Sequence, residues 1–198
     1  MTRYNVLLAG VGGQGLLTLG AIIGAAAIEK GVDVTIAETH GMSQRGGSLV
    51  VHVRLGEGAS PLIPKGAANL IIGMEALETA RNIVFANKET MVIMNNFLWP
   101  PPLSKYPSIE VLINELRKRV KLYVVDAMKM AKEETGLVVT ANTLVLGYAL
   151  AIDKELQKYI DVEAVVKGME KIFSGRALEL NKKVLWRGYR EGKKLVSN

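Results

Sequence analysis

The sequence has 198 residues, 49% of them hydrophobic, and a net charge of +6. This size suits a single domain with a substantial core. The chain has no cysteine and two histidines, His40 and His52, which argues against disulfides, cluster ligation by thiolates and a self-contained zinc site. The longest helical apolar run is too short to cross a membrane and the N-terminus has no cleavage signature, so we expect a cytoplasmic protein.

The N-terminal part predicts a strand, a helix and a second strand. Residues 4–9 form a short apolar run that stops at a glycine, and a helix-forming segment follows it. Gly20 and Gly24 lie on one face of that helix, a spacing that lets a helix lie close to a sheet. Residues 32–38 form the second strand, and the three elements together predict a βαβ unit with a parallel sheet.

The remaining elements continue an α/β pattern and then change to helices. Residues 49–55 alternate, with His52 and Arg54 on one face, and predict a half-exposed strand at or near an edge of the sheet. Further strands are expected at 68–74, 89–96 and 121–127, helices at 75–86, 109–119 and 128–136, and C-terminal helices at 143–152, 162–173 and 177–195.

This pattern predicts a Rossmann-like, doubly wound α/β fold. Its sheet is expected to be mostly parallel, with helices on both faces and a helical C-terminal extension. We expect one domain over residues 1–198, with the α/β core in 1–140 and the helical part in 141–198.

A glycine-rich turn joins the first strand to the first helix. Gly10, Gly12 and Gly15 fit the pattern G-x-G-x-x-G, and Gly13 is an additional glycine. In such a turn the glycines permit a tight bend and the close approach of a phosphate, while exposed N–H groups and the helix dipole favour an anion. The turn is therefore a candidate ligand site.

Three classes of protein have a turn of this kind. They are dinucleotide-binding oxidoreductases, adenylating enzymes of the ubiquitin-activating kind, and proteins that retain the turn as an anion-binding or structural feature. The absence of cysteine argues against the second class, because a thioester relay needs a thiolate. Glu38 lies near the position of a ribose-binding acid. Gln14 and Thr18 are candidates for hydrogen bonds to a ligand, although a threonine hydroxyl also bonds to its own preceding turn.

A second polar loop follows the second strand and leads directly into the next one. Its candidate ligand-binding residues are Thr39, His40, Ser43, Gln44, Arg45, Gly46 and Gly47. The glycines bend the backbone sharply. We expect this loop to lie beside the glycine turn, because both leave the carboxyl ends of neighbouring strands, the edge at which α/β proteins bind ligands. Arg45 is a candidate to clamp a carboxylate or phosphate, or alternatively to fix the loop through Glu38. His40 is a candidate proton or hydrogen-bond donor, or alternatively an interface residue.

Two further features point to partners. The C-terminal segment has seven basic residues against two glutamates, a net charge of +5. Those basic residues are Arg176, Lys182, Lys183, Arg187, Arg190, Lys193 and Lys194. They form either a solvated helix face or a surface for an anionic partner, and nucleic acid is not expected because no other motif supports it. Trp99, which precedes three prolines, is a candidate anchor on a partner protein.

The two loops together resemble a known family. "GVGGQGLLTLGAIIGAAAIEKGVDV" followed by "ETHGMSQRGGSLVVHVRLG" is similar to the gamma-type domain of the 2-oxoacid:ferredoxin oxidoreductases. The form "THGMSQRGG" resembles the small (beta) subunits of the branch that acts on indolepyruvate, and "LIIGMEALETAR" and "ANTLVLG" also match the family pattern. The resemblance covers about residues 4–150.

The resemblance implies a role inside a larger enzyme. Members of the family decarboxylate a 2-oxoacid on thiamine diphosphate, pass electrons through iron–sulfur clusters to ferredoxin, and transfer the acyl group to coenzyme A. Thiamine diphosphate, magnesium and the 4Fe-4S clusters are then expected in a large alpha subunit, and this chain in a hetero-oligomer that is inactive without it. The alternative from the glycine turn alone is a stand-alone NAD(P)- or nucleotide-binding oxidoreductase.

Overall fold

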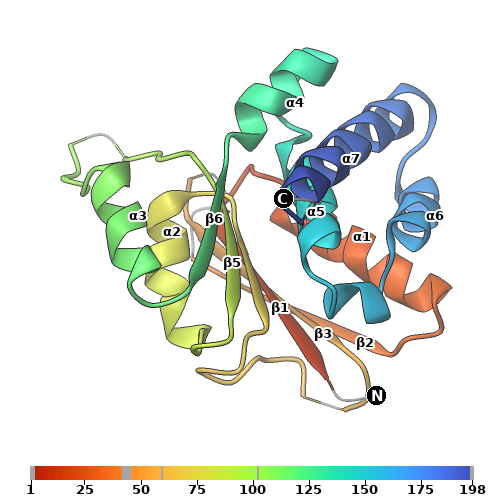
Figure 1. Cartoon of the computed structure of the whole chain (residues 1–198), viewed down its shortest axis with the longest axis horizontal. Coiled ribbons are helices and arrows are strands. Elements are labelled where there is room, and N and C mark those ends of the chain that lie inside the picture. Colours follow the sequence, from red (N-terminus) through yellow and green to blue (C-terminus); the bar gives the residue numbers. More distant parts are fainter. Residues whose placement is uncertain (1–2, 42–45, 59, 102, 197–198) are drawn as a thin grey trace.

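A six-stranded sheet with helices on both faces makes up the molecule (Figure 1). The computed structural model describes residues 3–41, 46–58, 60–101 and 103–196. Ser43, Gln44 and Arg45, three of the candidate ligand-binding residues, therefore lie outside the described residues, as does Met42.

The strands and helices follow the expected order. The strands are β1 (Tyr4–Val11), β2 (Val34–His40), β3 (Ser48–Leu55), β4 (Leu70–Gly73), β5 (Met91–Asn95) and β6 (Lys121–Val125). The helices are α1 (Leu16–Glu29), α2 (Ala76–Arg81), α3 (Ile109–Arg117), α4 (Ala127–Thr135), α5 (Ala141–Ile152), α6 (Val162–Ile172) and α7 (Gly175–Val196), with 3₁₀ segments η1 (Asn82–Phe85) and η2 (Leu156–Lys158). The helix expected over residues 75–86 is thus divided between α2 and η1.

The sheet is mostly parallel, as predicted, but its first unit differs from the prediction. The strand order is β2-β3-β1-β4-β5-β6. β1, β4, β5 and β6 are parallel neighbours, whereas β3 runs antiparallel to both β1 and β2. β3 therefore lies between the two strands of the expected βαβ unit. It is antiparallel to β2 because a short connection forms a hairpin rather than a crossover.

The prediction that residues 49–55 lie near an edge of the sheet is confirmed, since β3 neighbours the edge strand β2, but the prediction that this strand is half-exposed was wrong. The edges of the sheet are β2 and β6, and β3 is buried along nearly its whole length. Its polar residues His52 and Arg54 are only 3% and 7% exposed. They are covered by the following loop, whose backbone bonds to both: Ile63 N–H donates to His52 Nδ1 at 3.2 Å, and Arg54 donates to the Leu62 carbonyl at 3.0 Å.

The prediction that glycines bring the first helix close to the sheet is confirmed. A Cβ atom added at Gly20 would lie 3.1 Å from Val51 Cγ1, on β3. One added at Gly24 would lie 2.8 Å from Ile36 Cδ1, on β2. These two contacts fix α1 against the hairpin and so set the position of the helix N-terminus.

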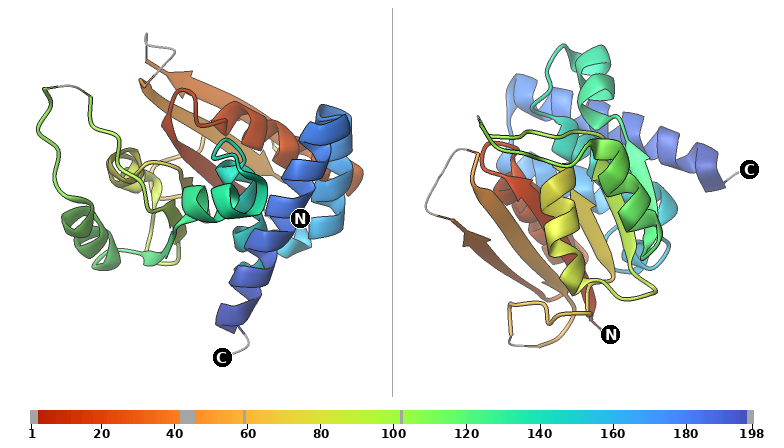
Figure 2. Two further views of the ribbon diagram at one scale, coloured as in Figure 1. Left: turned by 90° about the horizontal axis from the view of Figure 1, so that it is seen from above. Right: turned by 90° about the vertical axis from the view of Figure 1, so that its left-hand side faces the viewer.

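Helices cover the two faces of the sheet unequally. Viewed from above, the sheet separates α2 and α3 from α1, α5, α6 and α7 (Figure 2). The largest hydrophobic cluster lies on the second side and includes residues from β1, α1, α5, α6 and α7. The helical C-terminal part is therefore packed into the same core as the strands. None of the described helices is long and apolar enough to span a membrane.

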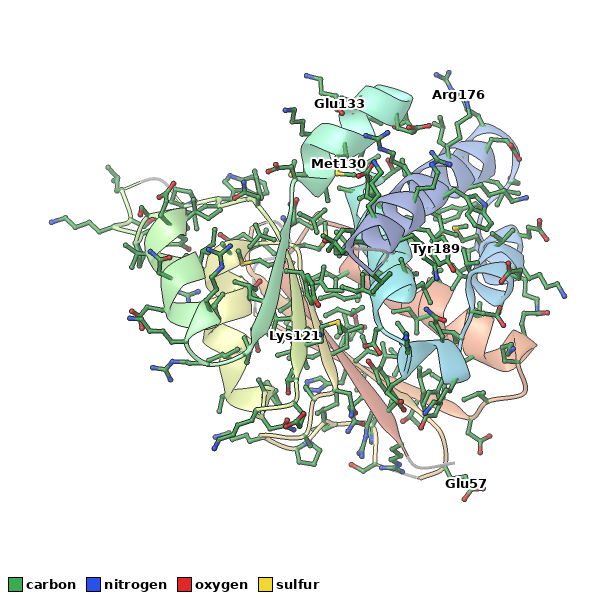
Figure 3. The ribbon with its side chains drawn as sticks, viewed as in Figure 1. Glu57, Lys121, Met130, Glu133, Arg176 and Tyr189 are labelled. Carbon is green, nitrogen blue, oxygen red and sulfur yellow. The ribbon has the colours of Figure 1, made fainter. Side chains whose placement is uncertain are left out.

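Charged side chains on the outer elements project into solvent (Figure 3). Arg176 at the start of α7 and Glu133 on α4 are both exposed. Some of the basic residues of α7 have acidic partners within the chain: Lys182 bonds to Glu170 at 2.8 Å, and Lys194 to Glu191 at 2.7 Å. Exposed pairs of this kind contribute little to stability.

Candidate functional site

The glycine turn forms the N-terminus of α1. Gly13 and Gly15 have φ of 101° and 73°, a conformation that residues with a Cβ rarely adopt. Gly15 is the N-cap, no side chain caps the helix, and its first turn has no acidic residue. The first N–H groups of a helix have no partner within the helix, and the dipole makes this end positive. The turn therefore presents donors to an anion.

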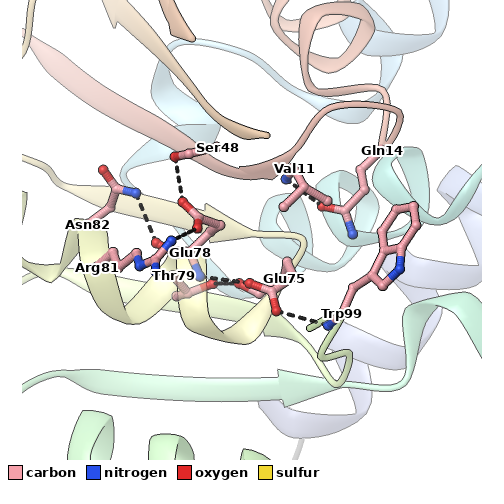
Figure 4. A network of polar contacts seen from close by, with 9 residues as sticks. All are labelled: Val11, Gln14, Ser48, Glu75, Glu78, Thr79, Arg81, Asn82 and Trp99. Atoms are coloured by element: carbon pink, nitrogen blue, oxygen red, sulfur yellow. Dashed lines mark hydrogen bonds and ion pairs between the residues drawn. The ribbon is translucent and has the colours of Figure 1, made fainter. Parts of the chain in front are cut away.

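The Gln14 side chain has a role within the fold. Its Oε1 accepts from Val11 N–H at 2.9 Å (Figure 4). Its Nε2 donates to the Met74 carbonyl at 3.0 Å. The same carbonyl accepts from Asn95 Nδ2 at 3.2 Å. Two side-chain amides thus connect the carboxyl ends of β1, β4 and β5 and hold the turn at that edge of the sheet.

Asn142 ties the turn to the helical C-terminal part. Its Nδ2 donates to the Gly15 carbonyl at 2.9 Å, and its Oδ1 accepts from Thr143 N–H at 2.8 Å. A Cβ atom added at Gly15 would lie 2.5 Å from Asn142 Nδ2. The third glycine of the pattern is therefore required by both its conformation and this contact. Thr18, the other candidate at this end of α1, is half-buried and lines a cavity with Asn142.

The second polar loop lies directly against the glycine turn, as expected. Gly12 N–H donates to the Gly47 carbonyl at 2.9 Å, and Gly46 N–H donates to the Gly12 carbonyl at 3.2 Å. The reason differs from the predicted one, because β1 and β2 are not neighbouring strands. The loop reaches the turn because it leads into β3, which pairs with β1.

A cavity of about 320 Å³ opens where the two loops meet. Its lining includes Gly12, Leu17, Glu38, His40 and Gly47. Glu38, Thr39 and His40 are exposed at the end of β2. The His40 ring nitrogen Nδ1 lies 3.1 Å from the Gly41 carbonyl. Among the candidates, the structure thus brings His40 and the glycines of both loops together.

A buried acidic pair that the sequence did not indicate supports the same edge (Figure 4). Ser48 at the start of β3 donates to Glu78 at 2.5 Å, and Arg81 pairs with Glu78 at 2.6 Å. Glu75 caps α2 by accepting from Glu78 N–H at 2.7 Å, and it also accepts from Trp99 N–H at 3.1 Å. The sequence signal for this cap is the spacing of the two glutamates: Glu75 at the N-cap is followed by Glu78 three residues later. These carboxylates hold β3 and the Trp99 loop in place.

Apolar side chains are exposed around the turn. Leu17, Trp99, Leu137, Val138 and Val139 are each between 44% and 63% exposed. Within the described residues, no group of three or more histidine, aspartate or glutamate side chains has the arrangement of a metal site. The arrangement suits the binding of an anion at the turn and contact with another apolar surface beside it.

Comparisons with known proteins agree with one another. The model of the family described as pyruvate ferredoxin/flavodoxin oxidoreductase matches residues 5–191. The chain is 39% identical, over 96% of its length and 95% of the relative, to "Indolepyruvate oxidoreductase subunit IorB" from Archaeoglobus fulgidus.

Two solved structures share the fold. Pyruvate oxidoreductase subunit PORC from Thermotoga maritima has a TM-score of 0.72 at 20% identity, covering 96% of this chain and 97% of its own. The 2-oxoglutarate:ferredoxin oxidoreductase from Magnetococcus marinus, solved with 2-oxoglutarate, coenzyme A and succinyl-CoA bound, has a TM-score of 0.74 at 18% identity. The match covers 98% of this chain but 32% of that one.

Proposed function

Since the chain belongs to the pyruvate ferredoxin/flavodoxin oxidoreductase family, we propose that it is the small subunit of an enzyme that oxidatively decarboxylates indolepyruvate or related aryl pyruvates. The supporting observation is its 39% identity, along nearly the whole length of both chains, to a relative named as an indolepyruvate oxidoreductase subunit. The reaction converts the 2-oxoacid and coenzyme A to an acyl-CoA and carbon dioxide, and two electrons pass to ferredoxin.

The redox and decarboxylation groups belong to a large partner subunit in this proposal. Iron–sulfur clusters are held by cysteine thiolates, and this chain has no cysteine. When bound to the partner with magnesium, thiamine diphosphate supplies the decarboxylation chemistry. The small subunit completes the assembly through the exposed apolar side chains beside its glycine turn.

The chain's own contribution is to bind the phosphates of coenzyme A at the glycine turn. The turn offers backbone donors at the positive end of α1, and no side chain competes for them as a cap. A Cβ atom added at Gly13 would meet nothing within 4 Å, so a ligand can approach the backbone closely there. Arg45 and His40 on the adjacent loop are proposed to pair with a carboxylate or phosphate and to donate a proton or hydrogen bond, respectively.

Reconstitution tests the proposed activity. We expect the chain co-expressed with its cysteine-rich, thiamine-binding partner to reduce ferredoxin with indolepyruvate and coenzyme A, and each chain alone to be inactive. Calorimetry of the isolated chain with NAD and NADP tests the alternative function, that of a stand-alone oxidoreductase. Tight binding together with turnover by the isolated chain would show that it is a stand-alone oxidoreductase.

A pair of glycine variants tests the proposed coenzyme A site. Gly13→Ala and Gly31→Ala both place a Cβ at positive φ in open space, the first at the turn and the second at the far end of α1. We expect Gly13→Ala to raise the KM for coenzyme A about ten-fold or more, because the Cβ blocks phosphate approach to the backbone. Gly31→Ala serves as the control for backbone strain. Equal KM values in the two variants would contradict the site.

A further inference from the structure

An apolar pocket of about 170 Å³ lies beside the glycine turn, separate from the cavity between the two loops. Its hydrophobic wall consists of Met74, Phe97, Trp99, Met128, Val138 and Val139. These residues come from the ends of β4 and β5, from α4 and from the segment that leads into α5. Gly13, Gln14, Ala141 and Asn142 complete the lining where it meets the turn (Figure 4 shows Gln14 and Trp99).

The size and chemistry of the wall suit a flat aromatic ring. An apolar cavity of about 150 Å³ is known to hold benzene. Thioethers such as those of Met74 and Met128 make favourable contacts with ring edges. The Phe97 and Trp99 rings are tilted by 59° with centroids 6.3 Å apart, and two non-parallel rings offer a third ring both edge and face contacts.

The polar side chains in the lining are already used. The Gln14 amide bonds to Val11 and Met74, and the Asn142 amide bonds to Gly15 and Thr143. A purine ring, with several nitrogens that need partners, would lose hydrogen bonds to water on entering. A phenyl or indole ring, with at most one N–H, avoids most of that cost.

We infer that this pocket receives the aryl side chain of the 2-oxoacid and so determines which substrates the complex accepts. The inference rests on the proposed function, because a substrate with an aryl group must be present. It also accounts for the exposed rim: Trp99 and Val139 are 52% and 63% exposed. A bound ring covered by the partner subunit would remove this apolar surface from water.

Binding of indole to the full chain tests the pocket without any enzymatic activity. With ¹³C-methyl-labelled methionine, assigned through Met→Leu variants, we expect indole to shift the Met74 and Met128 signals saturably. Met130 is the control, because it lines a different cavity beside α7. Absence of a saturable shift, an equal shift at Met130, or stronger binding of adenosine than of indole would overturn the inference.

Substrate selectivity of the assembled complex tests the role. Val138→Phe fills the pocket from an exposed position, and Val111→Phe makes the same change at an exposed site on α3. We expect Val138→Phe to lower kcat/KM for indolepyruvate about ten-fold or more relative to an aliphatic 2-oxoacid, and Val111→Phe to leave that ratio unchanged.

The outcomes separate the inference from the proposed function. If the complex turns over indolepyruvate but Val138→Phe lowers kcat/KM equally for the aryl and the aliphatic substrate, the pocket does not select the aryl group and the inference is wrong. If Val138→Phe prevents assembly, the indole titration of the isolated chain decides the inference. If indole binds at Met74 and Met128 but the complex turns over no aryl 2-oxoacid, the proposed function fails while the aromatic pocket stands.

Discussion

At the scale of single residues, burial changes the meaning of a polar pattern. His52 and Arg54 alternate with valines along β3, and such alternation is typical of a strand with one wet face. In the structure the loop after β3 covers that face and supplies its own polar groups. His52 also packs edge-on against Phe85, with ring centroids 5.4 Å apart. The residues therefore behave as a bonded part of the core.

Burial of His52 makes the stability of the fold depend on pH. Burial, reinforced by the charge of Arg54, lowers the pKa of His52 below its ordinary value of 6.5. Between pH 6.5 and this lowered pKa the unfolded chain therefore binds a proton that the folded chain does not, and below the lowered pKa both bind it. We expect the free energy of unfolding to fall by up to about 1.4 kcal/mol per pH unit as the pH drops below 6.5, with no such contribution above it.

Urea unfolding at pH 5.5 and 7.5 measures this effect. His52→Gln keeps a side-chain acceptor for Ile63 N–H but cannot titrate, so the difference between the two pH values should shrink. The same substitution at the exposed His40 is the control. An unchanged pH dependence in His52→Gln would show that another group is responsible.

The glycines of the site were predictable at this scale, whereas the amides that hold them were not. Gly13 and Gly15 adopt the positive φ that their pattern implies. Gln14 was expected to face a ligand, but its amide joins β1 to β4, and Asn142 reaches Gly15 across 127 positions of the sequence. An amide serves a ligand or the backbone equally well, so only the tertiary arrangement decides between them.

At the scale of elements, the length of a connection indicates how two strands pair, which hydrophobic periodicity does not. The order and type of the strands and helices follow from hydrophobic patterns. The antiparallel pairing of β3 with β2 follows instead from their connection, which is too short for a crossover. Which strand a hairpin then joins depends on the whole sheet, and a single sequence pattern does not determine it.

Helices α5 and α7 contact each other backbone to backbone through glycines. A Cβ atom at Gly188 would overlap the Leu144 carbonyl oxygen, and one at Gly147 would overlap the Leu185 carbonyl oxygen. Backbone atoms cannot move aside as a side chain can. We expect Gly188→Ala to lower the free energy of unfolding by about 2–3 kcal/mol, because the two helices must separate.

Gly20→Ala is the matched control in α1. Its added Cβ would lie 3.1 Å from a valine methyl group, which can shift slightly. Alanine also favours a helix over glycine, so the net change should stay within about 1 kcal/mol. Comparable losses in the two variants, measured by urea unfolding, would mean that glycine-mediated contact between α5 and α7 is not the cause.

At the scale of the whole molecule, the α/β part and the helical part share one core. Leu8, Leu19, Leu146, Val165 and Leu185 are fully buried and belong to a single cluster, although they come from five elements. Polar contacts cross the same boundary, since the Tyr4 hydroxyl donates to the Asp153 carboxylate. Burial and the carboxylate together raise the pKa of Tyr4, so the neutral hydroxyl persists in the fold.

A shared core predicts that the chain unfolds in one step. The two tryptophans report on the two parts separately: Trp99 follows β5 in the α/β part, and Trp186 lies on α7. Trp99→Phe and Trp186→Phe each leave one probe. We expect both to give the same urea midpoint and slope by fluorescence, because separating α5–α7 from the sheet would expose the largest cluster on both sides.

Both substitutions alter partly exposed side chains, which limits their own effect on stability. A lower midpoint for the Trp186 probe, with circular dichroism showing two transitions, would mean that residues 141–198 form a separate unit and that the single-domain assignment is wrong.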